Sequence, residues 1–293
     1  MKNLAISTTF TSDNSSLREA LELCRSIDIE FIELGSNHKY EKNYDYIREY
    51  SYKYLVHNYF PIPENSFVVN IASLNSAIRS KSIAHLKNAI DFCNDSGAHL
   101  YTFHPGFLTD PDGASLNSSN YDFLWNDNHL NQDSYAKAIN NFYRSLDIII
   151  PYAQSAGVCI AIESEGSISK KDHLIMQNPE EYLRLMELYS PEEIKVNLNV
   201  GHLNLASKAY SFSRFEFVEN IYHYLVAIEF SHNDRKTDQH LPIKFDQWYI
   251  DLMMSDKYLN IYKILEYRNT DIKIIKKNVQ MIRKKYNEFQ ISQ

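Results

Sequence analysis

Cysteine is scarce in this chain of 293 residues, and the three cysteines, Cys24, Cys93 and Cys159, lie far apart in the sequence. A disulfide framework needs paired cysteines, and a cysteine-based zinc site needs them at short, regular spacing. Neither pattern is present. The three residues are therefore predicted to be small buried side chains in a reducing compartment.

Long apolar runs are also missing. The N-terminal sequence MKNLAISTTF has no apolar segment of the length found in a signal peptide. No window of the sequence is long enough to be a membrane span. These absences predict a soluble, cytoplasmic protein without a membrane partner.

Positive charge is in short supply, because the net charge is −7 at pH 7. An acidic chain repels the phosphate backbone of nucleic acids unless basic residues are gathered locally, so a nucleic-acid partner is disfavoured. One basic run, 276–285, follows a helical pattern and is predicted to be a solvated face. Hydrophobic residues make up 44% of the chain, which is enough for one large core.

What the sequence does contain is an alternation of strand-like and helix-like segments. Strands are predicted at 3–9, 29–34, 53–59, 99–106, 158–163, 194–199, 226–231 and 260–267. Helices are predicted at 17–24, 44–52, 81–96, 134–156, 179–188, 215–224 and 271–289, with a short one at 245–254. Eight strands that alternate with helices predict a single (β/α)8 TIM barrel over residues 1–293. The polar stretch 105–133 is longer than a usual loop of this fold, and is either a lid or an insertion.

Most of the predicted strands end in a residue that could bind metal or move a proton. In a barrel of this kind the C-terminal ends of the strands meet at one rim, where active sites are built. Each residue alone is more simply a structural side chain, but together they predict a divalent metal site, because so many buried carboxylates and imidazoles would be costly without a cation. They are His57, His104, Glu163, Asn199, His202, His232 and Glu266, joined by Asp238 and His240 from the loop after the seventh strand.

The sequence resembles the xylose isomerase-like TIM-barrel superfamily, which includes sugar phosphate isomerases and epimerases and the endonuclease IV type of apurinic-site endonuclease. The resemblance is carried by LVHNYFP, FVVNIAS, YTFHPGF, IAIES, NLNVGHLNL, SHNDRKTDQHLP and KILEY, which run from about residue 53 to 267. These motifs are in the family order and lie at the predicted strand ends. The resemblance implies the barrel fold and a divalent metal cofactor, which could be Zn, Mn, Mg or Co.

Carried over to this chain, the resemblance implies that Glu163, His232 and Glu266 bind one metal ion. The family places an aspartate at the fourth ligand position, where this chain has Asn199 in the sequence NVGH. An amide oxygen can bind a hard cation but brings no charge, so the site is expected to hold metal more weakly or to prefer a different ion. His202 matches a histidine that contacts substrate in the epimerases and metal in the endonucleases.

The resemblance also leaves a second type of metal site open. His57, His104, Asp238 and His240 match positions that bind additional zinc ions in the endonuclease branch, which makes a site with two or three ions an alternative.

Two enzyme classes fit these residues. The first is an isomerase or epimerase of a sugar or sugar phosphate, in which Glu163 and Glu266 move the proton beside a metal-polarised carbonyl, His202 contacts substrate, and Arg235 binds a hydroxyl or phosphate. The second is a metal-dependent phosphoesterase, in which clustered ions activate water. A barrel that has lost catalysis is a third interpretation, and a homo-oligomer is left open.

Overall fold

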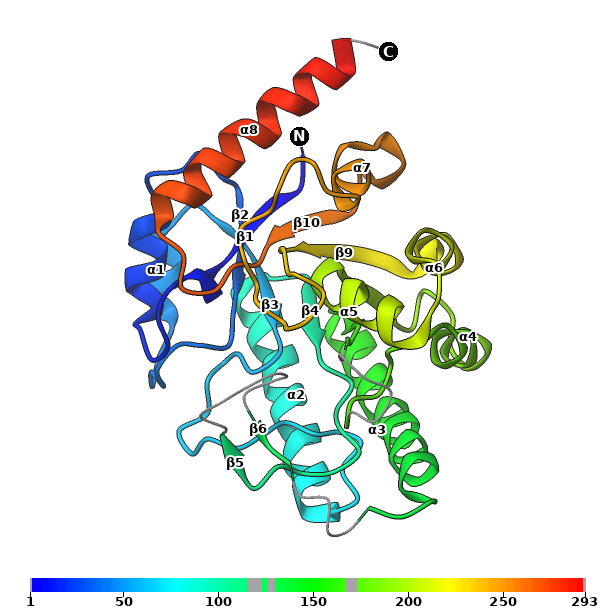
Figure 1. Cartoon of the computed structure of the whole chain (residues 1–293). Coiled ribbons are helices and arrows are strands. Elements are labelled where there is room, and N and C mark those ends of the chain that lie inside the picture. Colours follow the sequence, from blue (N-terminus) through cyan, green and yellow to red (C-terminus); the bar gives the residue numbers. More distant parts are fainter. Residues whose placement is uncertain (1, 115–122, 126–129, 167–172, 292–293) are drawn as a thin grey trace.

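Eight parallel strands form a closed barrel in the computed structural model, which describes residues 2–114, 123–125, 130–166 and 173–291. Around the barrel the strand order is β1-β10-β9-β8-β7-β4-β3-β2. The strands are β1 (Leu4–Ser7), β2 (Phe31–Leu34), β3 (Lys53–His57), β4 (Leu100–Phe103), β7 (Cys159–Glu163), β8 (Lys195–Asn199), β9 (Leu225–Phe230) and β10 (Tyr262–Leu265). The predicted (β/α)8 barrel is confirmed, and Figure 1 shows the helices arranged around it.

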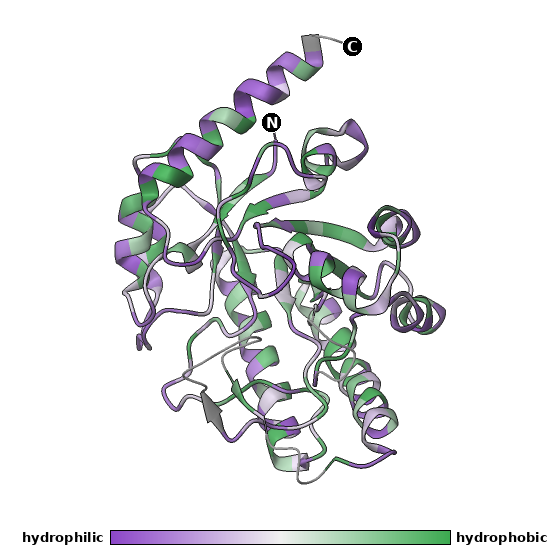
Figure 2. Ribbon diagram, in the orientation of Figure 1, coloured by the Kyte–Doolittle hydropathy of each residue, from purple (hydrophilic) through white to green (hydrophobic). Residues whose placement is uncertain are grey.

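The covering helices pack most of the core against the outside of the strands. They are α1 (Leu17–Cys24), α2 (Ser76–Ser96), α3 (Ser134–Ala156), α4 (Pro179–Leu188), α5 (Val200–Tyr210), α6 (Arg214–Ile221), α7 (Tyr249–Met254) and α8 (Ile272–Ile291). Figure 2 shows mainly hydrophobic strands and helices with one hydrophobic side, as expected when each helix buries a stripe against the sheet. Among the described residues, no helix is both long and apolar enough to cross a membrane.

The interior of the barrel has two levels, because residues two apart on a strand point to the same face. The deeper level is a small apolar cluster inside the strands, to which six strands contribute: Ala5, Leu55, Leu100, Ala161, Ala227 and Ile264. Two residues further along, these strands carry Ser7, His57, Thr102, Glu163, Glu229 and Glu266, all buried. The apolar level closes the barrel below, and the polar level faces the C-terminal rim.

The segments that differ from the predicted elements lie outside the strands. Residues 44–52 form a 3-10 helix at Asp45–Glu49 and no α-helix, so the connection after β2 is only partly helical. The helix α5 was not predicted, because residues 200–207 are all buried and therefore give no amphipathic pattern. The stretch 105–133 contains a two-stranded hairpin, β5 (Gly113–Ala114) with β6 (Phe123–Leu124), and the rest of that prediction lies partly outside the described residues.

Candidate active site

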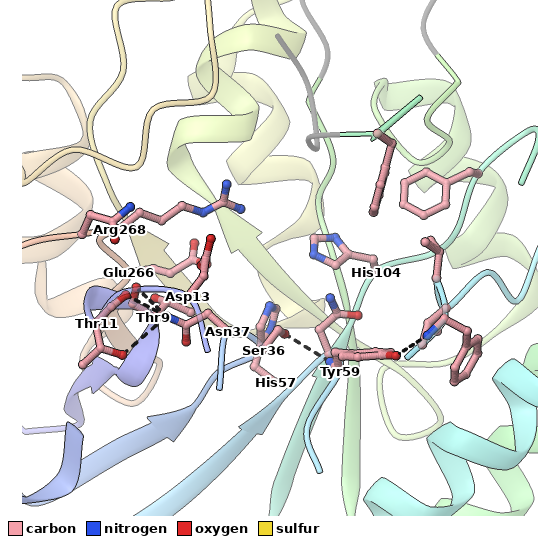
Figure 3. Close-up of a pocket in the computed structure, with 17 residues that line it drawn as sticks. Thr9, Thr11, Asp13, Ser36, Asn37, His57, Tyr59, His104, Glu266 and Arg268 are labelled. Carbon is pink, nitrogen blue, oxygen red and sulfur yellow. Dashed lines mark hydrogen bonds between the residues drawn. The ribbon is translucent and has the colours of Figure 1, made fainter. Parts of the chain in front are cut away.

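A cavity of about 420 Å³ opens at the C-terminal rim of the barrel, where the predicted site residues were expected. Among the predicted ligands, His57, His104 and Glu266 line it directly. Figure 3 shows Glu266 and Arg268 on one side of the space and His104 and Tyr59 on the other, with His57 at its floor. Glu163, His202, Asp238 and His240 complete two groups of possible ligands, Asn199 lies between these groups, and His232 belongs to neither.

The first His–carboxylate group consists of His57, His104 and Glu163. The Nε2 atoms of His57 and His104 each lie 3.5 Å from the same oxygen, Oε2 of Glu163. One ligand atom from each of the three residues falls within 4.8 Å of the others. Bonds of 2.0–2.1 Å in a tetrahedral zinc site place the ligand atoms roughly 3.3 Å apart. The group is therefore spaced for one small divalent cation.

Both histidines of the first group are held through their other ring nitrogen. Nδ1 of His57 lies 2.8 Å from Oγ1 of Thr102, and Nδ1 of His104 lies 2.7 Å from Oε1 of Glu165. Metal-binding histidines usually have such a partner, which fixes the tautomer and aims the second ring nitrogen at the ion. Glu165 and Thr102 therefore orient Nε2 of the two rings toward Glu163.

The second His–carboxylate group, His202, Asp238 and His240, repeats this arrangement. Nε2 of His202 lies 3.2 Å and Nε2 of His240 lies 2.8 Å from Oδ2 of Asp238. Nδ1 of His202 donates to the carbonyl oxygen of Ser164 at 2.8 Å, and Nδ1 of His240 lies 3.0 Å from Oε2 of Glu266. The two histidines again present Nε2 to one shared carboxylate, and a ligand atom from each residue falls within 4.8 Å of the others.

Electrostatics favour positive charge at both groups. Burial would raise the pKa of Glu163, but the imidazoles of His104 and His202 hold this pKa well below its ordinary value. Burial also acts against ionisation of Glu266, whose pKa is nevertheless lowered to about 2, mainly by His240. Conversely, burial would lower the pKa of His240, yet Asp238 and Glu266 raise it to about 9. The surroundings thus stabilise a cation, whether a proton on imidazole or a metal ion.

Buried acceptors without a partner support the same conclusion. Oε2 of Glu163 and Oδ1 of Asp238 are buried and accept no hydrogen bond from any described residue. A buried carboxylate oxygen normally has a donor, and an unsatisfied one is costly. Imidazole nitrogens and carboxylate oxygens are also the usual ligands of zinc and similar ions. The residues present therefore fit a divalent cation in each group.

Asn199 lies between the two groups, and it turns its nitrogen toward the carboxylates. Its Nδ2 donates to Oε1 of Glu163, Oε2 of Glu229 and Oε2 of Glu266, each at 3.0 Å. Its Oδ1 accepts from the backbone N–H of Gly201 and His202 in the first turn of α5, as an N-cap residue does. In this orientation the amide oxygen faces away from the carboxylates.

Two predicted site residues are not brought to the cavity. His232 follows β9, where its Nδ1 lies 3.3 Å from the hydroxyl of Tyr249 and its backbone pairs with Leu241. It belongs to neither His–carboxylate group. Arg235, predicted to bind substrate, is exposed, and its Nε donates to the carbonyl oxygen of Asn204 at 3.3 Å.

Two further glutamates of the barrel interior escaped the sequence analysis. Glu33 on β2 and Glu229 on β9 are fully buried, and with His57 they offer ligand atoms within 4.8 Å of one another. Burial, reinforced by neighbouring glutamates, raises the pKa of both well above its ordinary value. Each follows an apolar residue by two positions, as Glu163 follows Ala161. That pattern on the short strands was the signal that could have identified them.

The walls of the cavity combine hydroxyl and amide groups with aromatic rings. The hydroxyl and amide side chains include Thr9, Thr11, Ser36, Asn37, Asn58 and Asn269, and the aromatic side chains are Tyr59, Phe67, Phe107 and Phe123. Phe107 and Phe123 also contact Trp125, with ring centroids 5.1 and 5.6 Å apart, and Trp125 stacks on His173. These aromatic residues of the long loop therefore pack against one another, while two of them also face the cavity.

Comparisons with known proteins agree with this architecture. The family profile described as "Xylose isomerase-like TIM barrel" matches residues 21–285. The uncharacterized protein MJ1614 of Methanocaldococcus jannaschii is 25% identical over 279 residues, which cover 92% of this chain and 93% of that protein. A D-tagatose 3-epimerase-like protein has a similar structure, with a TM-score of 0.73 and 17% identity over 98% of each chain. The protein TTHB071 from Thermus thermophilus, soaked with ZnCl2, has a TM-score of 0.62 and 14% identity over 98% of each chain.

Proposed function

Because the chain belongs to the xylose isomerase-like TIM-barrel family, we propose that it is a metal-dependent isomerase or epimerase of a sugar or sugar phosphate. The observation that carries the proposal is the cavity, in which His57 and His104 of the first group and Glu266, which contacts His240 of the second group, share the walls with hydroxyl, amide and aromatic side chains. Hydroxyl and amide groups bind the hydroxyls of a sugar, and aromatic rings pack on its C–H faces. Similarity in fold to a D-tagatose 3-epimerase-like protein supports the same substrate class.

In this proposal the first group would hold one cation through His57, His104 and Glu163, and the second group would hold another through His202, Asp238 and His240. A divalent cation there would supply Lewis acidity, which polarises a substrate carbonyl and the neighbouring hydroxyl.

Thr102 and Glu165 keep the imidazoles of the first group in position. The side chain of Arg268, on the cavity wall, is suited to bind a phosphate or hydroxyl of the substrate.

Proton transfer is assigned to Glu266 and Glu163. Glu266 lines the cavity, and its ionised state makes it an acceptor for the proton on the carbon next to the carbonyl. Glu163 accepts from the same amide nitrogen of Asn199, and an oxygen of Glu163 lies within 4.8 Å of an oxygen of Glu266. One carboxylate removes the proton and the other returns it, as epimerisation requires.

Deuterium incorporation tests this proposal. The protein is loaded with Zn2+, Mn2+, Mg2+ or Co2+ and incubated with a panel of ketohexoses, ketopentoses and their phosphates in heavy water, and NMR then locates deuterium in the sugar. We expect label at the carbon next to the carbonyl, and we expect Glu266→Gln to suppress it. The exposed Glu64 serves as a matched control, since Glu64→Gln changes the same functional group away from the cavity.

The two His–carboxylate groups also favour a second candidate, a metal-dependent hydrolase of a small phosphoester. Two bound cations can activate water and stabilise a leaving oxygen. The net charge of −7 favours a small substrate over a nucleic acid. Hydrolysis of an aryl phosphodiester by the loaded protein, with no deuterium entering any sugar of the panel, would replace the isomerase by the hydrolase.

A further inference from the structure

The middle of the polar level of the barrel is occupied by a single neutral side chain. Asn199 is fully buried, and its Nδ2 donates to one oxygen of each of three glutamates, Glu163, Glu229 and Glu266, at 3.0 Å. The nitrogen carries two hydrogens, so it shares them among three acceptors. It thus lies where a cation bound by the same carboxylates would have to lie.

The direction of the Asn199 amide is fixed from both ends. Its oxygen accepts from the backbone N–H of Gly201 at 3.0 Å and of His202 at 3.2 Å. Turning the amide over would place its N–H groups against those two donors and its oxygen against three carboxylates. Both contacts would be repulsive, so the hydrogen-bond network itself selects the orientation. An amide oxygen can bind a cation, but here that oxygen is used to cap α5.

The four-ligand metal centre implied by the family resemblance has two of its ligands out of place in this chain. Such a centre needs an oxygen from position 199 and the imidazole of His232, together with Glu163 and Glu266. Asn199 instead presents N–H groups, whose partial positive charge repels a metal ion. His232 lies against Tyr249.

We propose that Asn199 replaces a central cation: its amide nitrogen holds Glu163, Glu229 and Glu266 together, and metal ions bind only at the two flanking His–carboxylate groups. The first flanking group shares Glu163 with this centre, and the second group contacts Glu266 of the centre through His240. Glu163 uses Oε1 for Asn199 and directs Oε2 to His57 and His104, and Glu266 contacts both Asn199 and His240. The inference rests on the cation sites of the proposed function but concerns the position between them.

The test is the number of zinc ions per chain in the wild type and in Asn199→Asp. Each protein is stripped with chelator, equilibrated with Zn2+ at one buffered free concentration, and analysed by plasma mass spectrometry. We expect two ions in the wild type and one more in Asn199→Asp, because aspartate keeps one oxygen for the cap of α5 and offers the other to the carboxylate centre. Asn197→Asp is the matched control. Asn197 lies two residues earlier on β8, and among the described residues its side chain hydrogen-bonds to Glu229 alone, at 2.6 Å, so Asn197→Asp should add no ion.

A second variant guards against a failure to fold. Asn199→Asp places a fourth carboxylate beside three buried ones, whereas Asn199→Asp combined with Glu229→Gln leaves the number of carboxylates at three. We expect the double variant to fold without metal and also to bind the additional ion, and zinc should raise its Tm more than that of the wild type. Three ions in the wild type, or equal counts in the wild type and both folded variants, would overturn the role of Asn199. If the wild type binds no zinc, the two flanking cation sites of the proposed function are refuted. An additional ion in the variants relative to the wild type would still support the role of Asn199, and its absence would refute that role.

Discussion

Replacing Glu165 by glutamine removes one negative charge behind the first His–carboxylate group without removing a ligand. Oε1 of Glu165 lies 2.7 Å from Nδ1 of His104, on the side of the ring opposite to Glu163. The carboxylate keeps the proton on Nδ1, so that the lone pair of Nε2 can bind a cation, and it increases the basicity of that nitrogen. Glutamine can still accept the hydrogen bond, but without charge.

Loss of such a partner typically weakens metal affinity ten- to a hundredfold, which corresponds to about 1.4–2.7 kcal/mol. Competition of the protein with a chromophoric chelator for Zn2+ measures the two binding steps. In Glu165→Gln we expect the step at His57, His104 and Glu163 to weaken by this factor. The step at His202, Asp238 and His240 should weaken less, because Oε2 of Glu165 lies 3.9 Å from Nδ1 of His202 and makes no hydrogen bond with it. Glu187→Gln, an exposed substitution on α4, is the control and should change neither step. If both steps of Glu165→Gln match those of the wild type, His104 is not oriented by Glu165 for metal binding.

Three further predictions concern stability. Burial lowers the pKa of His38 and of His85 to about 4, so between pH 6.5 and 4 the unfolded chain binds protons that the folded chain does not. The free energy of unfolding should therefore fall over this range by at most roughly 3 kcal/mol per histidine. Urea titrations should show a smaller fall for His38→Gln than for the wild type. Gly106→Ala should lower the free energy of unfolding by roughly 1–3 kcal/mol, because Gly106 has φ +108° and an added Cβ would lie 2.5 Å from Oδ1 of Asn70. An unchanged melting temperature would contradict this prediction. Asn178→Ala removes the capping box of α4 and should cost about 1 kcal/mol in the same titrations, whereas Asn178→Asp should retain most of that stability.

The barrel was predictable from the sequence because its strands and most of its helices repeat one simple pattern. Short apolar runs ended in polar residues, and long amphipathic segments separated them. The helix α5 was missed because residues 200–207 are all buried. Its hydrophobic residues therefore do not recur at the 3.6-residue spacing of an amphipathic helix. The segment 44–52 has spaced apolar residues but forms only a 3-10 helix.

For the candidate site, the sequence predicted most of the residues that gather, except Glu33 and Glu229, but not how they divide into groups. His57, His104 and Glu163 come from the ends of three different strands. His202 comes from the first turn of α5, and Asp238 and His240 come from the loop after β9. Only the folded barrel separates these residues into two groups. The direction of the Asn199 amide depends on the start of α5, which the sequence did not reveal. The position of His232 depends on Tyr249, a contact across 17 residues that no local pattern shows. Whether the predicted ligands bind metal stays a prediction.

Within the part of the chain that the structure describes, the apolar level beneath the carboxylates closes the site at its lower end. Six residues close the barrel from below: Ala5, Leu55, Leu100, Ala161, Ala227 and Ile264. On the proposed function, ions and substrate would therefore share the opening at the C-terminal rim. On the proposed function this imposes an order of loading: the cations arrive first, and the substrate then blocks their way out. A bound sugar should therefore slow the release of zinc to an external chelator, even when the sugar makes no direct contact with the ion.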